Sequence, residues 1–188
     1  MDQDESRGFL SLAGRRQSVR KFLPDPVPEA VLDRCFEAAR LAPSANNGQP
    51  WLFLASGSAE VRDGLARAAR FGPARSNAFA AGAPVIVAVL ETTGNRAARW
   101  GGALLGRSFP LMDLGMAVEN FCLQAADEGL GACVIGLFGV RGVRRALGLP
   151  PSARPALLIA VGKPADGTIR AKKRRALGEI RRYVGKGA

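Results

Sequence analysis

The chain has 188 residues, with 27 lysines and arginines against 16 acidic residues, a net charge of +11 and no histidine. This length suits one sizeable domain, so we expect a single domain over residues 1–188. The lack of histidine excludes histidine-ligated zinc sites and histidine-based catalytic triads, and we expect no metal site. The excess positive charge favours anionic partners, among them nucleotide cofactors and nucleic acids.

The N-terminal segment is polar and acidic, and no apolar run is long enough to span a bilayer. These features indicate a cytoplasmic protein that is not embedded in a membrane. The cysteines, Cys35, Cys122 and Cys133, lie far apart in apolar segments. An odd number of isolated cysteines without a Cys-x-x-Cys pattern is typical of buried thiols rather than disulfides.

Helices and strands are expected to alternate along the chain. Predicted helices cover residues 5–16, 28–40, 58–70, 110–131 and 140–149. Predicted strands cover residues 51–56, 83–91, 132–138 and 155–164. Strands separated by helices favour a sheet that is covered on both faces.

Two of these segments carry the expected architecture. The strand at 83–91 is apolar almost throughout, which predicts burial on both faces of the sheet. The helix at 110–131 is apolar nearly all round, which predicts a central position. Residues 94–109, rich in glycine and arginine, are expected to be mobile, and the basic tail at 165–188 has little core-forming content.

The octapeptide RRQSVRKF, residues 15–22, carries four positive charges and no acid. Arginine and serine near a helix end suit a phosphate, because they supply charge-assisted and hydroxyl hydrogen bonds. A basic, solvated helix end is the alternative interpretation.

A second polar segment, APSANNGQPW at residues 42–51, lies between a predicted helix and a predicted strand. It offers one hydroxyl and several carboxamides, and a carboxamide both donates and accepts hydrogen bonds. Such a set can bind a planar heterocycle with alternating donors and acceptors. The alternative is an asparagine-rich turn whose side chains cap the backbone.

The third polar segment is the tail sequence KKRRALGEIRRY, residues 172–183. Its charge suits a phosphate group or, alternatively, an arm that binds nucleic acid. Only Tyr183 is available there to stack on bases, so nucleic acid is the less expected partner.

Together these segments resemble the FMN-dependent nitroreductase family. The resemblance rests on RxSxRxF near the start, APSxxNxQPW after the second helix, D…N…Q.A…GLGxCxIG in the long helix and next strand, and KxR..L.EI in the tail. These motifs occur in the family's order and span nearly the whole chain.

The resemblance implies an α+β fold of three layers, α/β/α, with a central, mostly antiparallel sheet that the partner subunit's C-terminal segment completes. It also implies an intimate homodimer with FMN at its interface. The activity expected is ping-pong hydride transfer from NADH or NADPH, through flavin N5, to a nitroaromatic, quinone or similar acceptor. A flavin-binding relative with another reaction, dehydrogenation or fragmentation of the flavin or ligand, is the alternative.

The resemblance also assigns site residues. Arg20 is expected near flavin N1 and O2, where its permanent charge favours the reduced ring, so no side-chain acid or base is required. The other positions implied in cofactor binding are Arg16, Gln17 and Ser18 at the phosphate and ribityl chain; Pro43, Ser44, Asn47 and Gln49 at the ribityl chain or ring edge; the backbone of Val134, Ile135 and Gly136 near N5; and Lys172 and Arg174 at the phosphate.

The sequence departs from the family pattern at three places. Gln17 stands where many relatives carry a second basic residue, so phosphate binding leans on Arg16 and Arg174. The mid-chain polar ligand is left open between Arg75 and Asn77. The short segment 92–109 predicts an open substrate site.

Overall fold

A computed structural model describes residues 8–72, 77–94 and 106–185. Four strands form one sheet in the order β1-β2-β4-β3, and all three neighbouring pairs are antiparallel. The strands are β1 Trp51–Ala55, β2 Val85–Glu91, β3 Gly131–Ile135 and β4 Arg154–Gly162. The predicted antiparallel character of the sheet is therefore confirmed.

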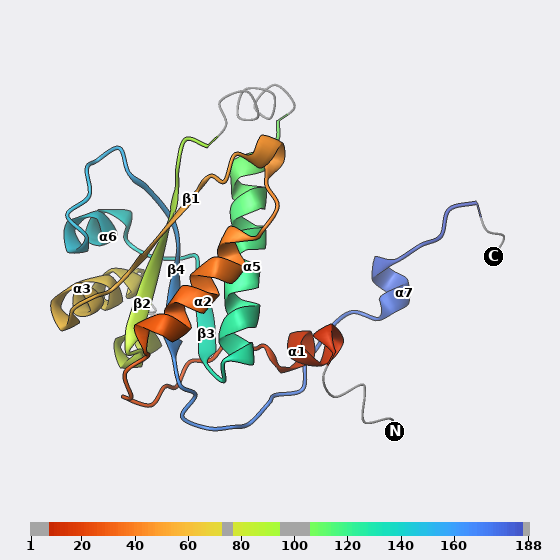
Figure 1. Cartoon of the computed structure of the whole chain (residues 1–188), viewed down its shortest axis with the longest axis horizontal. Coiled ribbons are helices and arrows are strands. Elements are labelled where there is room, and N and C mark those ends of the chain that lie inside the picture. Colours follow the sequence, from red (N-terminus) through yellow and green to blue (C-terminus); the bar gives the residue numbers. More distant parts are fainter. Residues whose placement is uncertain (1–7, 73–76, 95–105, 186–188) are drawn as a thin grey trace.

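Helices cover both faces of this sheet, which gives the three layers expected (Figure 1). One face packs against α2 and α5, and the other against α3 and α6. The helices are α1 Phe9–Arg15, α2 Glu29–Arg40, α3 Ala59–Ala69, α5 Phe109–Asp127, α6 Val140–Ala146 and α7 Leu177–Ile180, with short 3₁₀ turns η1 Ala45–Asn47 and η2 Ala78–Gly82. Within the described ranges, none of these helices is both long and apolar enough to cross a bilayer.

Strand β2 lies inside the sheet and is buried along almost its whole length, as its apolar run predicts. Its side chains alternate between two cores because successive residues of a strand point to opposite faces. Residues 85, 87 and 89 join the core beneath α2 and α5, and residues 86, 88 and 90 join the core beneath α3 and α6.

Helix α5 is the central helix of its layer. Its Phe121 is fully buried and packs against Phe36 of α2 and Phe53 of β1, with ring centroids 5.5 and 6.0 Å away. Its outer face carries the exposed apolar side chains of Leu111, Met112 and Met116. The apolar character all round α5 thus serves the core on one side and leaves an uncovered apolar surface on the other.

Several predicted boundaries were wrong; the helix predicted at 140–149, for example, ends at Ala146. The long helix ends at Asp127 rather than at residue 131, because Gly129 takes a positive φ of 73° and Leu130 N donates to Ala125 O. Strand β3 begins at Gly131 and ends at Ile135, four residues after its start, so the predicted strand at 132–138 was too long. The chain leaves the sheet at 136, where it becomes exposed.

The C-terminal arm, which we define as residues 165–185, leaves the body of the molecule. Figure 1 shows α7 standing clear of the sheet and of the helices that cover it. Residues 173–185 are exposed throughout, including the apolar Leu177 and Ile180. The prediction that the tail adds little to the core is confirmed for these residues.

Candidate functional site

The N-terminal stretch, residues 16–20, lies against the start of β3. Val19 N donates to Ala132 O at 3.1 Å, and Ser18 forms an isolated parallel bridge with Ala132. Gly131 permits this approach, because a Cβ there would lie 2.5 Å from Val19 Cγ2. Val19 is buried, and its neighbour Arg20 is exposed. The fold thus turns Arg20 outward beside an edge strand.

The chain that leads into the arm runs antiparallel to residues 21–23, which directly follow the N-terminal stretch. Leu23 N donates to Lys163 O at 2.9 Å, and Ala165 N donates to Lys21 O at 3.0 Å. Farther along, the Lys172 ammonium donates to the carbonyls of Ala13 and Arg16. The structure therefore brings Lys172 beside Arg16, although the two are 156 positions apart in the sequence.

Arg16, which the sequence predicts at a phosphate, lies against α5. Its Nε lies 3.1 Å from Glu119 Oε1 of α5, an ion-pair distance without hydrogen-bond geometry. That Nε atom is buried and makes no hydrogen bond to any described residue. Burial, followed by the charges of Arg16 and Arg174, lowers the pKa of Lys172. Positive charge that lacks sufficient acidic partners is concentrated here.

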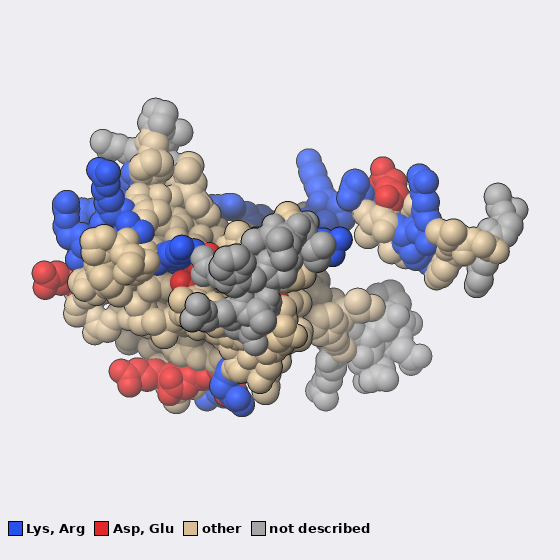
Figure 2. All heavy atoms as spheres, turned by 90° about the horizontal axis from the view of Figure 1, so that it is seen from above, with Lys and Arg blue, Asp and Glu red and all other residues tan. Residues whose placement is uncertain are grey.

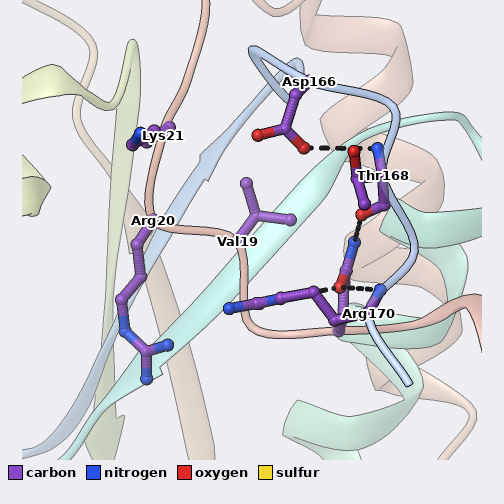
Figure 3. A pocket seen from close by; sticks show the side chains of 7 residues that line it. Val19, Arg20, Lys21, Asp166, Thr168 and Arg170 are labelled. Carbon is purple, nitrogen blue, oxygen red and sulfur yellow. Dashed lines mark hydrogen bonds between the residues drawn. The ribbon is translucent and has the colours of Figure 1, made fainter. Parts of the chain in front are cut away.

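Next to Arg16, a cavity of about 290 Å³ opens between the N-terminal stretch and the arm (Figure 3). Its lining combines three cations and one acid with neutral hydrogen-bonding groups. The lining residues are Gln17, Val19, Arg20, Lys21, Asp166, Thr168 and Arg170. Sequence reasoning missed Arg170, whose only signal was the general basic character of the tail.

Arg20 reaches a second group of residues on the other helical layer. Its guanidinium carbon lies 5.7 Å from the centroid of Phe79, a residue of η2. In the same segment, Asn77 Nδ2 donates to Leu137 O at 2.8 Å. Of the two mid-chain candidates, Asn77 therefore lies beside the end of β3, while Arg75 lies outside the described residues.

The expected N5 segment follows directly in β3. Val134 and Gly136 are exposed, whereas the side chain of Ile135 is buried in the core. Ile135 can therefore reach a ligand only through its backbone. Because Ser18 pairs in parallel with Ala132, the chain runs on to Arg20 in the same direction as β3 runs on to this segment.

The polar loop at 44–49 lies at the opposite end of α5. The buried carboxylate of Asp113 accepts a hydrogen bond from Ala45 N at 3.1 Å, near the start of the helix. The N-terminal stretch instead contacts the last turns of α5, where Arg16 and Ala126 line a common pocket. Asp113 and Ala126 are about 20 Å apart along α5, at a rise of ~1.5 Å per residue. One chain alone does not bring its two sets of predicted ligands together.

The loop itself has a strained backbone. Asn46, Asn47 and Gln49 all have φ between 41° and 51°, in the left-handed region. Asparagine tolerates this region, but a glutamine there is uncommon. Ser44 Oγ accepts from Gln49 N at 3.0 Å, and Gln49 Nε2 donates to Asn47 Oδ1 at 3.1 Å. Strain of this kind often accompanies a binding loop.

The remaining motif residues of α5 hold the layer together. Asn120 Nδ2 donates to Ala38 O of α2 at 3.1 Å, and Gln124 Nε2 donates to Glu128 Oε1 at 2.9 Å. The three cysteines are buried and free, as predicted. Burial raises the pKa of Cys35 to about 11 and that of Cys122 to about 12, so these thiols are not activated nucleophiles.

Known proteins resemble this chain over most of its length. A sequence model of the nitroreductase family matches residues 13–163. An NADH dehydrogenase of Thermus thermophilus is 28% identical over 178 residues, covering 81% of this chain and 84% of that protein. A 5,6-dimethylbenzimidazole synthase of Rhodobacter capsulatus is 29% identical over 167 residues, covering 79% and 80%.

Solved structures share the fold. A Desulfovibrio desulfuricans nitroreductase homologue in complex with FMN superposes with a TM-score of 0.75 at 27% identity, covering 95% of this chain and 96% of that one. A nitroreductase family protein of Clostridium difficile reaches a TM-score of 0.77 at 23% identity, covering 95% and 99%.

Proposed function

Because the chain belongs to the nitroreductase family, a family of FMN-dependent oxidoreductases, we propose that it transfers hydride from NADH or NADPH to a nitroaromatic, quinone or similar acceptor. The observation that carries this proposal is the convergence of the N-terminal stretch and the arm on one cationic cavity beside β3. FMN, when bound, supplies the redox chemistry, and the protein supplies position and electrostatics.

The residues present fit the phosphate of FMN. Arg16 offers a buried Nε without a hydrogen bond to the described residues, and Lys172 and Arg174 enter from the arm. Ser18 adds a hydroxyl group on the same stretch. Charge-assisted hydrogen bonds from arginine and lysine are the strongest common contacts to phosphate. Glu119 offsets only part of this charge.

Arg20, which lines the cavity, would hold a permanent positive charge beside the N1 and O2 edge of the ring. The Phe79 ring supports that guanidinium from one side. The exposed backbone at Val134 and Gly136 offers donors and acceptors to the rest of the ring. We assign no side chain as a general acid or base; water supplies protons. Donor and acceptor then use the same open site in turn, as in a ping-pong cycle.

We further propose that the site is completed by a second copy of the chain. Pro43, Ser44, Asn47 and Gln49 cannot reach the cavity of their own chain, because α5 separates the two. The exposed apolar side chains of α5 supply a surface that a partner subunit can bury. The arm, whose helix α7 lies away from the body of the molecule, can likewise extend along the partner subunit and complete the partner's sheet (Figure 1).

The first experiment is an absorbance spectrum of the purified protein. We expect a yellow protein whose flavin bands bleach when NADH or NADPH is added without oxygen, and recover when a quinone is added. A colourless protein that takes up no added FMN would contradict the proposal. Analytical ultracentrifugation of the same sample tests the dimer.

One relative favours a second candidate reaction. The similarity to a 5,6-dimethylbenzimidazole synthase extends over four fifths of that protein, about as far as the similarity to the NADH dehydrogenase. In this alternative, we expect the protein to bind FMN without the flavin being reduced by NADH or NADPH. Retained yellow colour after addition of either nucleotide therefore favours it.

Location and the nucleic-acid alternative are tested separately. The cytoplasmic location expected from the sequence stays a prediction, to be checked by fractionation of the source cells.

The cationic surface is uneven, with lysine and arginine gathered at one end of the molecule and along the arm (Figure 2). If the protein bound nucleic acid through it, affinity for a short duplex would fall steeply with salt.

A further inference from the structure

The carboxamide of Gln17 binds the arm through both of its ends. Its Nε2 donates to Thr168 O at 2.7 Å, and its Oε1 accepts from Arg170 N at 3.2 Å and from Arg170 Nε at 3.1 Å (Figure 3). One side chain thereby holds both the backbone and the guanidinium of Arg170. Lysine or arginine at position 17 could not do this, because both only donate.

Gln17 acts where the backbone pairing of the arm stops. Up to Ala165, the arm is held by backbone bonds to the segment that contains Lys21 and Leu23. Beyond that point, the bonds that hold the arm come from side chains, first Gln17 and then Lys172. The carboxamide is therefore the first side-chain contact that sets the direction of the arm after residue 168.

The Arg170 guanidinium is aimed back at the candidate site. A further nitrogen of the group donates to Ser18 O, and the side chain lines the same cavity as Arg20. Figure 3 shows it reaching from the arm toward the segment that carries Val19 and Arg20. A cation at position 17 would lie within about 4 Å of this guanidinium and would be repelled by it.

We propose that Gln17 is not a cofactor ligand but a positioning residue, which holds Arg170 so that Arg170 binds the phosphate-bearing end of the cofactor. The positive charge that the family resemblance leads us to expect at position 17 comes in this chain from the arm. This inference rests on the proposed FMN site. It replaces the direct role for Gln17 that the sequence resemblance implied.

The positioning half is tested on the full-length protein without added flavin, by amide hydrogen exchange. Gln17→Met keeps the length of the side chain and removes every hydrogen bond, so the Arg170 amide should exchange about fivefold faster. Gln17→Glu keeps the acceptor for Arg170 and should retain its protection. The Leu23 amide, which donates to Lys163 O, serves as the internal control for an intact fold. If the Arg170 amide of Gln17→Met exchanges as fast as that of the wild type, the positioning role of Gln17 is wrong.

The ligand half is tested by comparing the affinities for FMN and for riboflavin, which lacks the phosphate. Arg170→Gln and Gln17→Met should each weaken FMN binding about tenfold and leave riboflavin binding nearly unchanged. The double variant should lose no more than either single variant, because the two residues act as one unit. Arg141→Gln on α6 removes an equal charge away from the cavity and controls for net charge.

The outcomes are distinguishable from failure of the proposed function. If the wild type binds FMN but the two losses add, or riboflavin weakens equally, the assignment to Arg170 is wrong while the function stands. If the wild type binds no FMN, the proposed function and the role of Arg170 as a phosphate ligand are both wrong. Hydrogen exchange alone then decides whether Gln17 positions Arg170.

Discussion

A single methyl group at Gly131 should displace the N-terminal stretch without touching any proposed ligand. A Cβ at this position would lie 2.5, 2.6 and 2.8 Å from the three side-chain carbons of Val19. Carbon atoms in contact are ordinarily ~3.5–4.0 Å apart, so Val19 must withdraw by about 1 Å. Val19 is buried between Ser18 and Arg20, and both must move with it.

The cost of Gly131→Ala can be worked from these contacts. Overpacking of a close contact costs about 1–3 kcal/mol. Loss of the hydrogen bond from Val19 N to Ala132 O, now 3.1 Å, would add about 1 kcal/mol. FMN affinity should fall as well, because the displaced stretch carries Ser18 and Arg20.

Urea unfolding measures the free energy of unfolding of this variant, and flavin fluorescence measures its affinity for FMN. Gly57→Ala is the matched control, since a Cβ there meets no atom within 4 Å. If Gly131→Ala lost less than about 0.5 kcal/mol and bound FMN as the wild type does, the close packing of the N-terminal stretch on β3 would be refuted.

Four further outcomes follow from the structure. Arg20→Ala should make reduction of the bound flavin less favourable by about 1–3 kcal/mol, and an unchanged midpoint potential would remove its role. Arg34 donates to the Glu128 carboxylate at 2.6 and 2.7 Å and lowers its pKa to about 2. The resulting stabilisation is complete above the ordinary carboxyl pKa of 4.5 and is lost as the pH falls toward 2. The free energy of unfolding of Glu128→Gln, measured by urea titration at several pH values, should therefore depend less on pH across that range than that of the wild type. Cys122, with its pKa raised to about 12 by burial, should resist iodoacetamide at neutral pH until the protein is unfolded. Phe121→Ala should lower the free energy of unfolding by about 3–5 kcal/mol in a urea titration, because the ring is fully buried among two other aromatic rings.

Much of the fold was predictable because the spacing of apolar residues along the sequence indicates which faces of a helix or strand are buried. The unbroken apolar run of β2 predicts an interior strand, and the structure buries it on both faces. Boundaries were harder, since they depend on single backbone conformations. The positive φ of Gly129 ends α5 earlier than the apolar pattern suggests. Strand β3 begins at Gly131, one residue before its predicted start, and Val19 occupies the space that a side chain at position 131 would need.

The candidate site was predictable in its chemistry but not in its arrangement. The motifs predict that Arg16 and Lys172 bind one phosphate, and the structure brings the two residues into contact through the carbonyl of Arg16. They did not reveal that the loop after Ser44 lies at the far end of α5 from that pair. The length of a helix is readable from sequence, but which segments pack at each of its ends is not.

The sequence by itself determined the kinds of element, their order, and the stock of cations, carboxamides and small residues from which a site can be built. These follow from local properties: periodicity, turn residues and charge. Only the tertiary structure decided that Gln17 meets Arg170, 153 positions later, and that this carboxamide serves the arm. A hydrogen bond needs its donor and acceptor within about 3 Å, and that distance depends on the path of the whole backbone between them.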